Sequence, residues 1–89
     1  MDTNLQKINT ANNELKRIED SFDFDERYVT SICLFPDNEV SFSLFTPDNH
    51  QESLTFRLNK QQTLTCTRKG TLAHEQTRFE QHIKQWAGL

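Results

Sequence analysis

Three residues near the end of the chain, His74, Glu75 and His82, have side chains that could hold a metal ion. A zinc-binding helix places two histidines four residues apart around a glutamate, but here Arg78 is four residues after His74. On a helix His74 and His82 lie two turns apart, too far to share one ion, and the cation between them repels it. We therefore expect no metal site and interpret both histidines as solvent-facing polar residues.

Two cysteines, Cys33 and Cys66, are the strongest candidate nucleophiles. Neither has a histidine placed near it, and they are too far apart in sequence for a zinc knuckle. Both fall within apolar strand patterns, where a free thiol behaves as a small hydrophobic side chain. With only two glycines there is no phosphate-binding loop. We expect reduced, structural cysteines, no cofactor and no enzymatic activity.

The densest charge cluster is acidic and precedes the most apolar stretch of the chain. Residues 1–52 carry 11 acidic and four basic side chains, whereas residues 53–89 carry two acidic and six basic ones. One interpretation of the cluster is a docking surface for a basic partner, and the alternative is a solvated helix end and loop. The predicted partner-binding residues are Asp20, Asp23, Asp25 and Glu26.

The basic second half raises the alternative of a nucleic-acid-binding regulator. Its six cationic side chains are Arg57, Lys60, Arg68, Lys69, Arg78 and Lys84. Nucleic-acid modules usually combine a larger positive excess with stacking aromatic residues, whereas the net charge here is −3. We therefore expect nucleic-acid binding to be the weaker alternative.

The elements that position these residues follow from hydrophobic periodicity. Apolar residues at steps of three and four predict a helix over residues 5–22. Alternating apolar residues then predict four strands, over residues 28–35, 40–44, 53–58 and 63–67. Two Pro-Asp-Asn segments and the Asn59-Lys60 pair are typical of tight turns. Short connections of this kind predict an antiparallel meander, which puts Cys33 and Cys66 on opposite edge strands.

A second helix is predicted after Gly70, with Leu72, Phe79, Ile83 and Trp86 on its apolar face. Because each helix and each strand is apolar on one side, we expect both helices to cover one face of the sheet. The predicted architecture is a two-layer α+β fold, α-β-β-β-β-α, in a single domain spanning residues 1–89.

The first predicted strand is apolar on both faces, although a two-layer fold covers only one. We therefore expect self-association as a homodimer through this strand or the sheet face beside it. The alternative is that the N-terminal helix or the loop around Phe24 folds over this edge. The predicted dimer-interface residues are Val29, Cys33, Phe35 and Phe45.

Composition bounds the remaining choices. The chain has 89 residues and 34% hydrophobic residues, enough for one modest core. No segment resembles a signal peptide or a membrane span, so we expect a cytoplasmic protein. These observations favour a small protein-interaction module, such as the adaptors, inhibitors or regulatory accessories that bacteria and their phages encode. The other classes are a nucleic-acid-binding regulator and a small enzyme.

Overall fold

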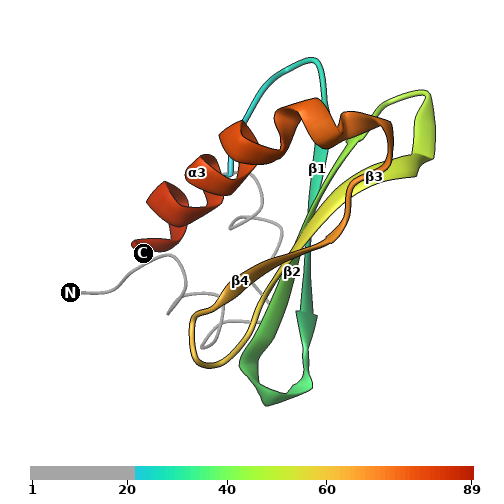
Figure 1. Cartoon of the computed structure of the whole chain (residues 1–89). Coiled ribbons are helices and arrows are strands. Elements are labelled where there is room, and N and C mark those ends of the chain that lie inside the picture. Colours follow the sequence, from blue (N-terminus) through green and yellow to red (C-terminus); the bar gives the residue numbers. More distant parts are fainter. Residues whose placement is uncertain (1–21) are drawn as a thin grey trace.

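The computed structural model describes residues 22–89 as an antiparallel sheet with one helix packed against it (Figure 1). The helix predicted over residues 5–22 lies outside the described residues, apart from Phe22 at its end. The strands are β1 (Val29–Phe35), β2 (Glu39–Thr46), β3 (Asn49–Leu58) and β4 (Leu64–Arg68). A short 3-10 helix, η3 (Gly70–Glu75), leads into α3 (Gln76–Ala87).

The four strands pair in the order β1-β2-β3-β4, and every pairing is antiparallel. The predicted four-stranded meander is therefore confirmed. The register places Ile32 opposite Phe42, Phe42 opposite Phe56, and Phe56 opposite Cys66. One row of apolar side chains thus crosses the sheet on a single face, because neighbouring strands keep paired residues on the same side.

The connections differ in length from one hairpin to the next. Pro36–Asn38 forms one turn of 3-10 helix between β1 and β2, whereas only Pro47 and Asp48 separate β2 from β3. The third connection spans residues 59–63 rather than the tight Asn59-Lys60 turn predicted from the sequence. The Asn59 side-chain Oδ1 holds this loop by accepting hydrogen bonds from the backbone N–H groups of Gln61 (3.0 Å) and Thr63 (2.9 Å).

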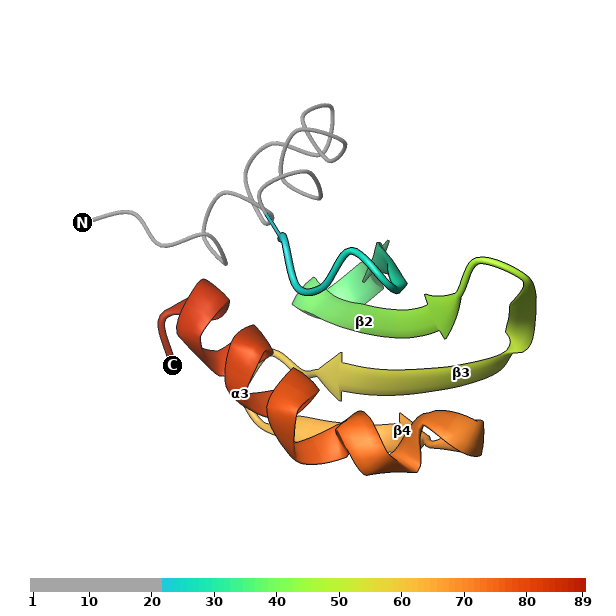
Figure 2. The ribbon, with the colours of Figure 1, turned by 90° about the horizontal axis from the view of Figure 1, so that it is seen from above.

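The helix α3 and the preceding η3 lie on one side of the sheet, which gives two layers (Figure 2). From the predicted apolar stripe, Leu72, Phe79 and Ile83 are buried, and Trp86 packs against the core half-buried. Gly88 ends α3 with φ 78°, a left-handed conformation that glycine adopts without steric cost. The C-terminal helix is thus confirmed, although it begins with 3-10 geometry.

The core between the layers consists of apolar side chains from β1, β2, β3, η3, α3 and the segment before β1, and two half-buried side chains of β4, Leu64 and Cys66, pack against it. Its largest fully buried members are Phe22, Phe42, Phe56, Phe79, Leu44, Leu54, Leu58, Ile83 and Val40. Strand alternation sends the intervening residues to the other face of the sheet, called here the outer face. No described element covers this outer face (Figure 2).

The two cysteines lie on the two edge strands, as predicted, and on opposite faces of the sheet. Cys33 on β1 is exposed, whereas Cys66 on β4 is half-buried and packs against the core. Both are free thiols.

Candidate functional site

The outer face carries exposed apolar side chains along β1. Val29 and Phe35 are 37% and 40% exposed, and Cys33 between them is also exposed. Phe45 of β2 lies directly opposite Val29 in the register and is half-buried. The structure therefore brings Val29 and Phe45 together at one end of β1 and leaves Phe35 at the other end.

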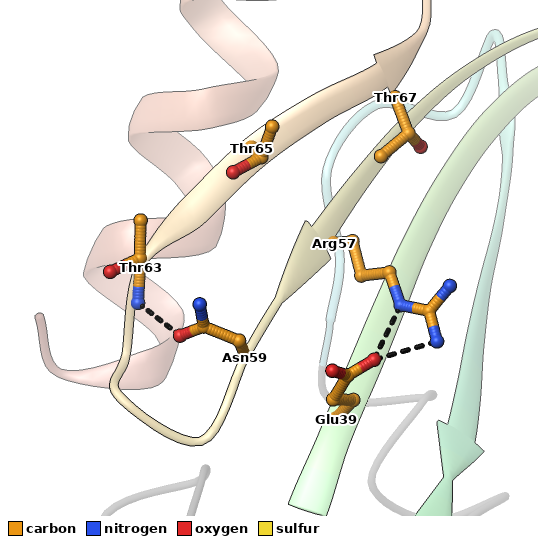
Figure 3. A pocket seen from close by; sticks show the side chains of 6 residues that line it. All are labelled: Glu39, Arg57, Asn59, Thr63, Thr65 and Thr67. Carbon is orange, nitrogen blue, oxygen red and sulfur yellow. Dashed lines mark hydrogen bonds and ion pairs between the residues drawn. The ribbon is translucent and has the colours of Figure 1, made fainter.

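The middle of the outer face is polar and rich in hydroxyl groups. The Ser43 and Thr55 hydroxyls, on paired positions of β2 and β3, lie 3.2 Å apart within hydrogen-bond distance. Beside them a shallow hollow is lined by Glu39, Arg57, Asn59, Thr63, Thr65 and Thr67 (Figure 3). The lining side chains are three threonines, an asparagine and the Arg57–Glu39 pair, so the hollow presents hydroxyl, amide and charged groups.

Arg57 fixes the edge of this hollow nearest β1. Its Nε donates to Glu39 Oε2 at 2.8 Å and its Nη2 lies 2.6 Å from the same oxygen (Figure 3). Its guanidinium also lies 4.3 Å from the centre of the Phe35 ring. A cation over an aromatic face is attracted by the negative charge of that face. The side chains of β1, β2 and β3 are thereby connected across the outer face.

A second cluster of charged residues joins the segment before β1 to the start of α3. Arg78 donates two hydrogen bonds to the Glu75 carboxylate (3.0 and 2.7 Å) and one to Asp25 (3.0 Å). Tyr28 donates its hydroxyl to Glu75 Oε2 at 2.6 Å, and Arg27 donates to both oxygens of Asp25. We call these five residues the Glu75 network.

The Glu75 network shifts the pKa values of its members in the directions that favour charge pairing. The hydrogen bonds from Arg78 lower the pKa of Glu75 to about 2, and those from Arg27 hold the pKa of Asp25 well below its usual range. The bond from Tyr28 to Glu75 raises the pKa of the Tyr28 phenol. Both carboxylates therefore stay charged at all but strongly acidic pH.

These contacts involve one residue of the predicted acidic docking cluster and leave two others exposed. Asp25 is engaged within the Glu75 network, whereas Asp23 and Glu26 are exposed, and Asp20 lies outside the described residues. The pairing of Asp25 with Arg78 could not be predicted from the sequence, because the two residues are 53 positions apart. Glu75 was singled out only for metal binding, and in fact it is buried as the acceptor of this network.

The expectation that both helix histidines face solvent is wrong for His82. His74 is exposed, but the His82 ring lies against two phenylalanine rings, with centroids 4.9 Å from Phe22 and 5.2 Å from Phe24. Phe24 also packs against Phe79, on the side of the sheet that α3 covers. The Phe24 side chain therefore packs toward the helix layer and not over the outer face.

Three of the predicted basic residues are engaged with carboxylates in the described part of the chain. Arg57 pairs with Glu39, Arg78 with Glu75 and Asp25, and Lys84 lies 3.9 Å from Glu80. A phosphate backbone would have to compete with these ion pairs for the three cations.

No group of three metal-ligating side chains lies close together in the described part of the chain. Among residues 22–89, no helix is both long and apolar enough to cross a membrane. No protein-family model, no curated protein and no solved structure matches this chain.

Proposed function

We propose that this chain is a small protein-interaction module that associates with a second copy of itself through the outer face of β1. The observation that supports this proposal is the exposure of Val29, Cys33 and Phe35 on a face that no described element covers. Burying apolar surface of this kind contributes about 25 cal/mol per Å². A small domain with a modest core gains stability from such an association.

The geometry favours a second copy because the apolar side chains stand at both ends of one strand. In a two-fold arrangement with the two β1 strands antiparallel, the Val29 end of one copy meets the Phe35 end of the other. The polar hydroxyls and the Arg57–Glu39 pair would then lie at the rim, as is usual in interfaces between proteins.

The proposed adaptor, inhibitor or regulatory role further requires a different protein, and the exposed carboxylates of Asp23 and Glu26 are the surface we assign to it. These side chains lie in the segment before β1, on no part of the proposed dimer surface. A partner with clustered lysine or arginine residues would complement them. The exposed Cys33 thiol fits a reducing compartment, so the proposal places the protein in the cytoplasm.

Analytical ultracentrifugation over a series of micromolar concentrations tests self-association. We expect a monomer–dimer equilibrium that Val29→Lys and Phe35→Glu each shift strongly toward monomer, because each replaces apolar surface of the proposed interface with a charged side chain that dimerisation would have to desolvate. Thr65→Lys, on the same face but on the opposite edge strand, is the matched control and should leave the equilibrium unchanged. Reversing the charges of Asp23 and Glu26 should also leave it unchanged.

Two results would contradict the proposal: the wild-type protein sediments as a monomer at every concentration, or the dimer survives both β1 substitutions.

Titration with generic duplex DNA and RNA tests the alternative function. Binding that falls steeply as salt rises would support a nucleic-acid-binding regulator instead.

A further inference from the structure

The side chain of His82 lies at the junction between α3 and the segment before β1. Its ring meets the rings of Phe22 and Phe24 nearly edge-on, at interplanar angles of 73° and 65°. Phe22 is buried and also contacts Trp86, one helical turn beyond His82, with a centroid separation of 5.1 Å. An ionisable ring thus occupies an aromatic contact surface between two parts of the chain.

The Nε2 atom of His82 is buried and has no hydrogen-bond partner among the described residues. A neutral imidazole tolerates this environment, because one nitrogen can remain an acceptor and the ring is largely apolar. A protonated imidazole needs partners for two N–H donors and carries a charge. Burying that charge without a partner is strongly unfavourable.

We propose that His82 is a pH-sensitive latch, which in its neutral form holds Phe22 and Phe24 against α3 and on protonation releases them. The proposal is independent of the proposed dimer surface, which lies on the other face of the sheet. It assigns a regulatory role to the contact between α3 and the segment before β1.

Two charged side chains face His82, one from each element that packs around it. Asp23, on the segment before β1, favours the protonated ring, whereas Arg78, one turn earlier on α3, opposes it. Burial outweighs Asp23 and lowers the pKa of His82 below its ordinary value of 6.5. The aromatic neighbours of His82, Phe22 and Phe24, carry no charge.

The lowered pKa of His82 determines how the stability of its packed form depends on pH. A released or unfolded His82 binds its proton more readily than the packed ring does, so its stabilising contribution is complete above about pH 6.5 and is lost as pH falls below that value. Glu75 and Asp25 keep their charges in this range because their pKa values are also lowered. The Tyr28 end of the segment therefore stays anchored while the Phe22 end detaches.

Trp86 is the only tryptophan in the chain and is in contact with Phe22, so its fluorescence reports the release directly. We expect the emission of the wild-type protein to shift to longer wavelength on acidification from about pH 8 to about pH 5, the range in which histidines titrate. Replacing His82 with glutamine, which cannot be protonated there, should abolish the shift. His74→Gln, at the exposed histidine of η3, is the matched control and should retain it.

Proton NMR of the wild-type imidazoles provides a test that does not depend on a variant folding. The expected result is that the His82 ring titrates with a midpoint below pH 6.5. The Phe22 and Phe24 ring signals should change with the same pH midpoint. The proposal is overturned if His82 titrates at or above 6.5, if the Trp86 emission is constant over the range, or if the shift persists in His82→Gln.

Discussion

At the scale of single residues, Glu75 has the most unusual environment in the described chain. It is only 8% exposed, yet it is charged and accepts hydrogen bonds from Arg78 and from Tyr28. The sequence could show Glu75 only as a neighbour of His74, because Tyr28 lies 47 positions away and no local pattern connects the two. Contacts between residues far apart in the sequence are therefore the part of the candidate site that sequence periodicity could not predict.

Replacing Glu75 with glutamine should destabilise the protein near neutral pH. The substitution keeps the shape of the side chain but removes the charge that pairs with Arg78, and losing a charged hydrogen-bond acceptor at a buried position costs about 1–3 kcal/mol. The Glu75 pKa of about 2 lies below its ordinary value of 4.5, so this contribution exists above about pH 4.5 and disappears as pH falls toward 2.

Thermal unfolding of both proteins at several pH values checks this expectation. The difference in Tm between wild type and Glu75→Gln should be large at pH 7 and should narrow steadily below pH 4.5. Glu80→Gln is the control, since Glu80 is paired only loosely with Lys84 at 3.9 Å and such surface pairs contribute roughly 0–1 kcal/mol. An equal Tm difference at every pH would refute the assigned role of the charge.

At the scale of elements, alternation predicted the strands well and the connections less well. The predicted strand over residues 40–44 lies within β2, but β3 begins at Asn49, four residues before the predicted start at residue 53. The reason is that residues 49–52 are polar and carry no alternating signal, although Thr46 pairs with Asn49 immediately after the turn. Backbone pairing in this hairpin thus extends beyond the apolar residues that specify its register.

The loop between β3 and β4 contains a residue in an unfavourable conformation. Gln62 has φ 65°, in the left-handed region where a residue with a Cβ atom is strained by about 1 kcal/mol. We expect Gln62→Gly to raise the midpoint of chemical denaturation, with a gain smaller than about 1 kcal/mol because glycine also gives the unfolded chain more freedom.

Lys60→Gly in the same loop is the matched control, because the φ angle of Lys60 is not positive. It should lower the denaturation midpoint or leave it unchanged. If Gln62→Gly lowers the denaturation midpoint as much as Lys60→Gly does, the left-handed conformation at position 62 carries no strain.

At the scale of the whole molecule, one aromatic side chain connects the layers. Phe79 of α3 is fully buried and contacts Phe22 and Phe24 before β1 and Phe56 on β3, with ring centroids 5.3–5.9 Å apart. The helical spacing of Phe79 predicted that it faces the sheet. It could not predict that Phe24 would share this contact, because Phe24 follows the predicted helix and precedes the strand pattern.

Phe79→Ala should therefore destabilise the protein by about 3–5 kcal/mol, the usual cost of emptying a buried phenylalanine site. Phe35→Ala, on the exposed outer face, should cost no more than about 1 kcal/mol, which is the value of an exposed cation–π contact with Arg57. Denaturation in urea at a protein concentration that keeps both variants monomeric compares them. If the two substitutions lower the free energy of unfolding by similar amounts, Phe79 does not connect the layers.

The contacts between the segment before β1 and α3 also have a consequence for the order of events during synthesis. Asp25 and Tyr28 are made early, but their partners Arg78 and Glu75 are 53 and 47 positions later. On a translating ribosome the strands of the meander can pair one after another and Phe22 can contact Phe42 of β2, whereas Asp25 and Tyr28 lack Arg78 and Glu75 until α3 emerges. The nascent chain therefore exposes the aromatic surface that α3 covers until α3 has been synthesised, and over that interval it is most open to aggregation.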